Sequence, residues 1–144
     1  MDFKFAHNSI TVLDLERSIA FYQKALGLQE VSRRKSLDGQ ATLVSLSDGQ
    51  SDVKLELVSH EGRLSPYDLG ENETHIAFTT ENFEEARELH QQMDCICYEN
   101  PRKNLYFIND PDGYWLERSC PAAERSDTKI PKAFAPMKGR RFLL

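Results

Sequence analysis

The sequence contains no long hydrophobic run and no excess of basic charge. No stretch approaches the roughly 20 consecutive apolar residues that a membrane-spanning helix needs. The polar start Met1–Phe5 lacks the basic and apolar segments of a signal peptide, so a cytosolic location is expected. With 18 Lys and Arg against 23 Asp and Glu, the formal net charge is −5, which argues against a broad nucleic-acid-binding surface. We therefore expect a small-molecule substrate or a protein partner, and neither a nucleic acid nor a membrane.

Cysteine is also scarce, since the chain contains only Cys95, Cys97 and Cys120. An odd number without a secretory signal argues against a disulfide framework. One residue separates Cys95 from Cys97, which is neither the spacing of a redox pair nor that of a usual zinc site. We interpret these two as free thiols without a chemical role.

The length of 144 residues, with 40% hydrophobic and 28% charged residues, is typical of a single globular domain. Residues 121–144 differ from the rest, because they hold six basic residues, two acidic residues and three prolines. We interpret them as an irregular C-terminal tail that follows a domain of residues 1–120. The apolar end Phe142–Leu144 has two interpretations, docking on a neighbouring subunit or a frayed terminus.

An internal repeat becomes visible when His7 is aligned with His75. Each copy begins with a short apolar strand and continues into a helix whose apolar residues are three or four positions apart. Asp14 is the expected N-cap of the first helix and Gly27 stands just past its end. Asn82 is the expected N-cap of the second helix. The chain is therefore expected to contain two copies of one structural unit.

Short β-prone runs separated by Asp-Gly turns follow each helix. The predicted strands are Gln29–Arg33, Ala41–Ser47, Val53–Ser59, Cys95–Tyr98, Leu105–Asn109 and Tyr114–Ser119. The pattern predicts an α+β fold of two βαβββ modules, at about residues 1–60 and 72–120, with the linker between them at Glu61–Glu73. With the helices on the outer face, the sheets would form a curved, open barrel whose inner face lines a cavity.

Four ionisable side chains are expected on the same face of the predicted sheets. Strand side chains alternate between faces, and the alternation places His7, Glu56, His75 and Glu117 on the face that no helix covers. A lone strand histidine is more often hydrogen-bonded or exposed than metal-binding, and a lone strand glutamate usually faces solvent. Two imidazoles and two carboxylates at matched places in two matched modules favour a shared divalent cation instead, since the ion offsets both negative charges. His60 and His90 lack this support, and His90 is expected at the surface of the second helix.

A family resemblance is carried by the segments His7, Val12–Gly27, Leu55–Leu57, Thr74–Phe78 and Asp110–Glu117. Together they resemble the vicinal-oxygen-chelate superfamily, and within it most closely the glyoxalase I (lactoylglutathione lyase) family. The resemblance implies an octahedral nickel or zinc site formed by the two histidines, the two glutamates and two waters. It implies a metal-stabilised enediolate, formed by proton transfer on the hemithioacetal of a 2-oxoaldehyde and a thiol, with Glu117 as the base and Glu56 as the weaker candidate. It also implies a homodimer.

The sequence departs from glutathione-using relatives at two places. The first strand has no arginine after His7, and Ser59-His60 stands where such relatives tend to have an asparagine. Arg102 and Lys103 are candidates for binding a substrate carboxylate, with a solvated basic loop as the equally weighted alternative. The alternative functions are a related epimerase, an antibiotic-modifying thiol transferase or a non-catalytic ligand-binding protein of the same fold.

Overall fold

The computed structural model describes residues 1–120, and the predicted tail at residues 121–144 lies outside the described residues. The chain forms two compact units. The first consists of Met1–Glu71 and Asp110–Tyr114, and the second of Asn72–Asn109 and the residues from Trp115 onward. Within the described residues, no helix is both long and apolar enough to cross a membrane.

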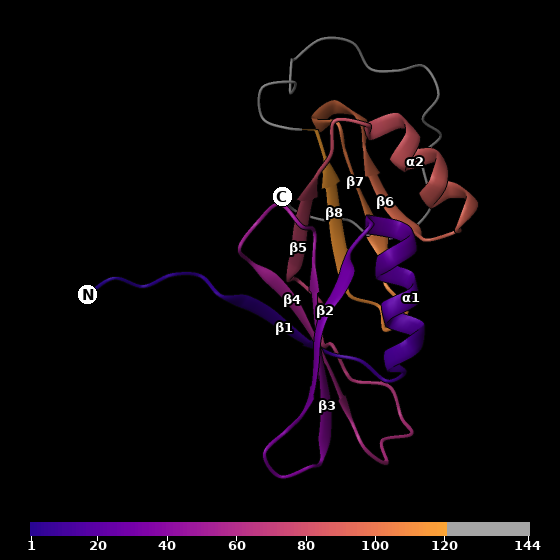
Figure 1. The fold of residues 1–144 in the computed structure, drawn as a ribbon. Helices are drawn as coiled ribbons and strands as arrows, with labels where there is room; N and C mark the ends of the chain where they lie inside the picture. Colours follow the sequence, from indigo (N-terminus) through magenta and orange to yellow (C-terminus); the bar gives the residue numbers. More distant parts are fainter. Residues whose placement is uncertain (121–144) are drawn as a thin grey trace. The chain divides into compact units, whose positions relative to one another are not determined.

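The first unit is a four-stranded mixed sheet with one helix (Figure 1). Its strands lie in the order β1-β4-β3-β2, with β1 parallel to β4 and the other neighbours antiparallel. The elements are β1 (His7–Thr11), α1 (Leu15–Leu26), β2 (Gln29–Lys35), β3 (Ala41–Ser47) and β4 (Lys54–His60). The order β-α-β-β-β is the one that the sequence predicts.

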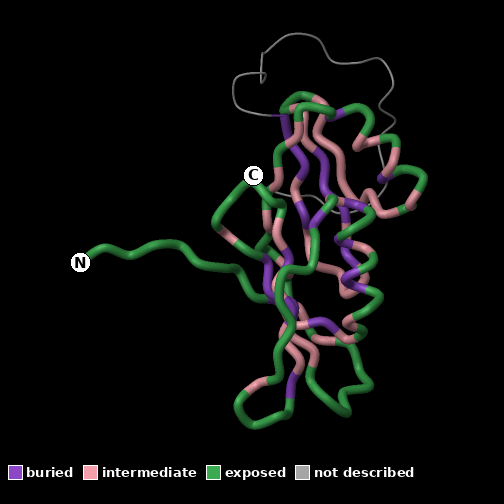
Figure 2. Tube along the Cα trace, in the orientation of Figure 1, coloured by how far each residue is buried: buried purple, intermediate pink, exposed green. Residues whose placement is uncertain are grey.

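Helix α1 begins and ends where its capping residues predict. The Asp14 carboxylate accepts a hydrogen bond from the Arg17 backbone N–H, and Gly27 ends the helix with a φ of 69°, a conformation that suits glycine. One side of α1 is buried and contributes to a core with the sheet, and Figure 2 shows these buried stretches along the helix and the strands. The buried apolar residues of this core include Ile19, Tyr22, Ala25, Val44, Leu46, Leu55 and Leu57.

The turn Asp110–Tyr114 belongs to the first unit although it joins two strands of the second. The Tyr22 hydroxyl donates a hydrogen bond of 2.8 Å to the buried carboxylate of Asp110. The carboxylate of Asp112 accepts a hydrogen bond of 2.9 Å from the backbone N–H of Leu13. Burial raises the pKa of Tyr22 and also the pKa of Asp110. These contacts make the turn part of the packing around α1.

The second unit repeats the arrangement of the first. Its sheet has the order β5-β8-β7-β6, with β5 parallel to β8. The elements are β5 (His75–Thr79), α2 (Phe83–Gln92), β6 (Ile96–Asn100), the short 3₁₀ helix η1 (Pro101–Lys103), β7 (Leu105–Asn109) and β8 (Trp115–Ser119). The α+β class and the two βαβββ modules are thus confirmed.

Helix α2 corrects one expectation. His90 was expected at the surface, but it is fully buried, and its Nδ1 lies 2.8 Å from the Tyr106 hydroxyl. The prediction was wrong because a polar residue beside the apolar stripe of a helix can be buried when a neighbouring strand offers a partner. Phe83 also packs on Tyr106, with 5.3 Å between the ring centroids. Asn82 occupies the N-cap position, although its side chain makes no capping hydrogen bond.

Within residues 1–120, Cys95 and Cys97 form no disulfide, as the sequence predicts. Burial raises the pKa of the Cys95 thiol to about 11 and that of the Cys97 thiol to about 12. Because the thiolate is the nucleophilic form, these side chains are inert near neutral pH.

Candidate functional site

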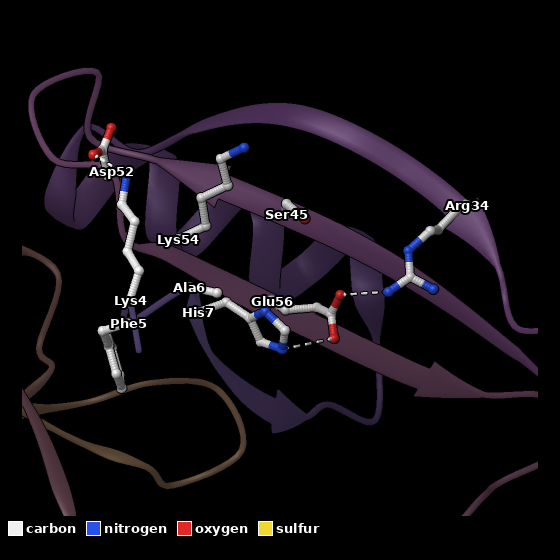
Figure 3. A pocket seen from close by; sticks show the side chains of 9 residues that line it. All are labelled: Lys4, Phe5, Ala6, His7, Arg34, Ser45, Asp52, Lys54 and Glu56. Atoms are coloured by element: carbon white, nitrogen blue, oxygen red, sulfur yellow. Dashed lines mark hydrogen bonds and ion pairs between the residues drawn. The ribbon is translucent and has the colours of Figure 1, made fainter. Parts of the chain in front are cut away.

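In the first unit, one histidine and one glutamate lie side by side on the sheet face opposite α1. His7 comes from the start of β1 and Glu56 from the middle of β4. Leu55 and Leu57 flank Glu56 in the chain and are buried in the core, so the alternation of side chains turns Glu56 to the other face. The His7 Nε2 lies 3.9 Å from the Glu56 Oε1 (Figure 3).

Glu56 is held by two further side chains. It is only 7% exposed, so its charge needs compensation. The Ser9 hydroxyl donates a hydrogen bond of 3.2 Å to Oε1, and the Arg34 Nη2 donates one of 2.8 Å to Oε2. Figure 3 shows the Arg34 guanidinium reaching Glu56 from β2, while the His7 ring approaches from the other side. Both oxygens of this carboxylate therefore have a defined partner.

A pocket of about 470 Å³ surrounds this pair. Three of its lining side chains are basic, namely Lys4, Arg34 and Lys54. Lys4 forms an ion pair of 2.6 Å with Asp52, another lining residue. The pocket is thus polar and charged, and it can hold a cation beside His7 and Glu56 or an anionic group beside the basic side chains.

The second unit presents an equivalent pair on its own sheet. His75 begins β5, and Glu117 lies in the middle of β8. The His75 Nε2 lies 3.3 Å from the Glu117 Oε2, and the Glu117 side chain is 17% exposed. Tyr106 packs under α2, and the next residue, Phe107, pairs with Glu117 across the sheet. The pair therefore lies on the face opposite α2, as strand parity predicts.

Aromatic rings surround this second pair. The Phe107 ring meets His75 edge-on at 5.2 Å between centroids and lies 5.2 Å from Trp115. Tyr98 lies 5.9 Å from Phe107. A small cavity of about 50 Å³ opens between these rings, and Glu73 lies at its wall. His75 therefore has aromatic neighbours, whereas the neighbours of His7 are mostly polar or charged.

Two predicted substrate-binding residues lie elsewhere in the second unit. Arg102 and Lys103 are exposed side chains of η1 and line neither of the two pockets. Their role stays a prediction. Sequence reasoning missed Arg34, because its position depends on the register between strands: Arg34 pairs with Leu43 on β3, which shares a face with Ser45, the partner of Glu56.

The donor types in both units fit a divalent metal ion. Imidazole nitrogen and carboxylate oxygen are suitable ligands for nickel and zinc, and each unit brings one of each together. Among residues 1–120, no group of three or more His, Cys, Asp or Glu side chains is close enough to hold an ion. Each unit thus supplies half of the predicted ligand set.

Comparison with known proteins identifies the family. The model of the Glyoxalase/Bleomycin resistance protein/Dioxygenase superfamily matches residues 4–117. The chain belongs to this superfamily. The predicted resemblance is therefore confirmed, and the two βαβββ units represent the fold of the superfamily.

Curated members of the superfamily resemble this chain over most of its length. The lactoylglutathione lyase of Neisseria meningitidis serogroup A is 33% identical over 122 residues, which cover 79% of this chain and 88% of the relative. The lactoylglutathione lyase of Salmonella typhimurium is 31% identical, with coverage of 79% and 90%. Several superfamily relatives that match this chain are thus named as enzymes.

Solved structures of the superfamily agree. The trypanothione-dependent glyoxalase I of Leishmania major superposes with a TM-score of 0.73 at 32% identity, covering 83% of this chain and 87% of that one. Glyoxalase I of Zea mays superposes with a TM-score of 0.70 at 27% identity, and 80% of this chain covers 43% of that longer chain.

Proposed function

We propose that the protein is a glyoxalase I-like lyase that requires a divalent metal ion. Its substrate would be the hemithioacetal that a 2-oxoaldehyde forms with a thiol, and its product the thioester of the corresponding 2-hydroxy acid. The observation that carries the proposal is the duplicated pair: in each unit an imidazole nitrogen lies within 3.9 Å of a carboxylate oxygen, on the sheet face opposite the helix. The similarity to lactoylglutathione lyases supports the same function.

His7, Glu56, His75 and Glu117 would hold the metal, and we propose nickel or zinc. The bound cation would supply Lewis-acid polarisation of the substrate oxygens. The two pairs would bind one ion together. The two modules that share the ion would belong either to one chain or to two chains of a homodimer, and a homodimer is the assembly that we propose. We further propose that the enzyme works in the cytosol.

Proton transfer is assigned to Glu117. Its carboxylate would take the proton from the carbon that bears the hydroxyl and sulfur, and would return it to the adjacent carbon. In the described residues, the side-chain contact of Glu117 is the one with His75, so this carboxylate has fewer side-chain partners than that of Glu56. Phe107 lies across the sheet from Glu117, and an apolar neighbour strengthens electrostatic interactions at this position. Glu56 is the second candidate base, and Arg102 and Lys103 are proposed to contact a substrate carboxylate.

The direct test is Glu117→Gln. This change keeps the shape of the side chain but removes its ability to accept a proton, so kcat should fall by a factor of about 100 or more. Glu88→Gln, at an exposed position of α2, is the matched control and should keep wild-type turnover. Unchanged turnover of Glu117→Gln would reject the assignment of the base. Turnover assays with a hemithioacetal, with epimerase substrates and with an antibiotic plus a thiol separate the lyase from the alternative enzymes.

A further inference from the structure

The two glutamates of the candidate site differ in how they are held. Glu56 accepts hydrogen bonds on both of its oxygens, from Ser9 at 3.2 Å and from Arg34 at 2.8 Å. Glu117 has His75 at 3.3 Å as its side-chain partner in the described part of the chain. Among the described residues, Glu56 therefore has more side-chain partners to fix its orientation than Glu117 has.

Arg34 is placed so that it reaches Glu56 across the sheet. It lies on the edge strand β2 and pairs with Leu43, while Ser45, on the same face of β3, pairs with Glu56. The Arg34 side chain runs over β3, and its guanidinium ends at the Glu56 carboxylate (Figure 3). Its contact is with Oε2, which leaves Oε1 on the side of the His7 ring.

We propose that Arg34 is a positioning residue that, together with Ser9, orients Glu56 so that its Oε1 is presented toward the Nε2 of His7 as a metal ligand. The inference rests on the proposed function, because it needs Glu56 to be a ligand. It divides the roles of the two carboxylates: Glu56 is the anchored ligand, and Glu117 is the carboxylate that moves the proton. Arg34 itself touches neither substrate nor metal in this arrangement.

The size of the effect follows from the position of Arg34. Removal of a residue that orients a metal ligand through a hydrogen bond typically weakens metal binding 10- to 100-fold. Loss of a positive charge would act in the opposite direction by strengthening cation binding. The side chain of Arg34 is 58% exposed, so solvent and salt screen its charge, whereas the hydrogen bond acts directly on a glutamate side chain that is 9% exposed. The positioning effect should therefore dominate.

The neighbouring residue offers a matched control. Arg33 lies on the opposite face of the same strand and pairs with Glu30 at 2.8 Å and with Glu16 at 2.6 Å. Arg33→Met removes the same charge from β2 without touching the candidate site. Any difference between Arg33→Met and Arg34→Met therefore reports the contact with Glu56 and not the net charge.

The experiment is a titration of the full-length protein with Co²⁺, followed by visible absorption, and it needs no turnover. Arg34→Met should raise the Co²⁺ dissociation constant 10- to 100-fold and change the absorption bands of the bound ion. Arg34→Lys keeps a donor and should recover part of the affinity, and Arg33→Met should match wild type. Thermal unfolding of each variant shows that the loss of binding does not come from loss of the fold.

Two results would overturn the inference, and Glu56→Gln tells them apart. If Glu56→Gln weakens Co²⁺ binding but Arg34→Met binds as tightly as wild type, or more tightly, then Arg34 is not a positioning residue and the proposed ligand set stands. If Glu56→Gln binds Co²⁺ like wild type, then Glu56 is not a ligand, and the ligand set of the proposed function fails together with the inference.

Discussion

The two units share one strand order, but different side chains surround the equivalent glutamates, Glu56 and Glu117. Across the sheet from Glu56 lies Ser45, and across from Glu117 lies Phe107. The first unit surrounds its pair with serine, lysine and arginine side chains, whereas the second surrounds its pair with aromatic rings. The βαβββ framework therefore fixes the positions of the histidine and the glutamate, while side chains on the neighbouring strands determine the surroundings of each carboxylate.

This difference suits a division of labour between the two carboxylates. Hydrogen bonds from Ser9 and Arg34 hold a buried carboxylate in one orientation, which suits a permanent ligand. Among residues 1–120, the side-chain contact of Glu117 is the one with the His75 ring, and Phe107 packs edge-on against that ring. A carboxylate with few partners can turn between two carbons of a substrate, as the proposed proton transfer requires.

The largest expected effect is on the free energy of unfolding, when the residue across the sheet from each glutamate is replaced by alanine. Phe107→Ala removes a ring that is 3% exposed and contacts His75 and Trp115, so it should lower the free energy of unfolding by about 3–5 kcal/mol. Ser45→Ala, the equivalent change in the first unit, should stay within about 0.5 kcal/mol of wild type. Denaturant unfolding curves measure both. Equal losses would mean that the aromatic packing of the second unit has no special weight.

Local signals explain how much of the fold was predictable. The caps Asp14 and Gly27 predict the bounds of α1 because capping depends on residues that are close in sequence. The bounds of β3 and β7 were predicted because Asp-Gly turns or a proline-containing turn flank these apolar runs. Strand β2 extends to Lys35, two residues beyond the prediction, because an exposed edge strand carries no hydrophobic alternation.

Features that depend on distant residues escaped prediction. The burial of His90 depends on Tyr106, which lies on another element, and no pattern within the helix reveals it. The contact of Arg34 with Glu56 joins strands that are not neighbours in the sheet, so sequence spacing alone does not show it. Strand parity did put each histidine and the glutamate of its module on the face opposite the helix, because alternation is a local property. The closeness of the two side chains depends on the pairing of β1 with β4 and of β5 with β8.

The next effect concerns the buried tyrosine of each unit. Tyr22→Phe removes the hydroxyl that donates to the Asp110 carboxylate and should cost about 1.5–3 kcal/mol, the usual range for a hydrogen bond to a charged group. Tyr106→Phe removes a hydrogen bond with the imidazole of His90 and an interaction with the buried guanidinium of Arg118, so it should also cost about 1.5–3 kcal/mol. The free energies of unfolding at pH 7 measure both losses. A loss below about 0.5 kcal/mol for either variant would show that its hydroxyl does not stabilise the fold.

A smaller effect should appear in the pH dependence of stability. Burial is the main cause that raises the pKa of Asp110 in the folded protein above its ordinary value near 4. Because the folded state then binds this proton more tightly than the unfolded state, stability falls as pH rises through the window between the two pKa values. Asp48 behaves in the opposite way: hydrogen bonds from Ser51 and Gln50 lower its pKa, so its contribution is lost as pH falls below about 4.

Two variants separate these opposite slopes. Asp110→Asn should remove the loss of stability on raising pH from about 4 toward neutrality, and Asp48→Asn should remove part of the loss on acidification. The measurement is the free energy of unfolding at a series of pH values for each variant and for wild type. Parallel pH profiles for wild type and Asp110→Asn would show that this carboxyl is not perturbed by burial.

The smallest effect concerns the thiols of the second unit. The pKa values of Cys95 and Cys97, raised to about 11 and about 12, keep both thiols protonated at pH 8. A thiol-specific reagent should therefore modify both residues much more slowly in the folded protein than in the unfolded chain. Their joint replacement by alanine should leave kcat unchanged. Rapid modification of the folded protein would show instead that these residues are reactive.

The proposed function requires that both units donate ligands to the same divalent ion. Elemental analysis of the purified wild-type protein and of the variants His7→Ala and His75→Ala measures their metal content without any substrate. We expect roughly one nickel or zinc ion per chain in wild type and a strong loss of metal in both variants, since each removes one imidazole from a shared site. A metal content that falls in one variant and not in the other, or a wild-type protein that binds no ion, would contradict the account.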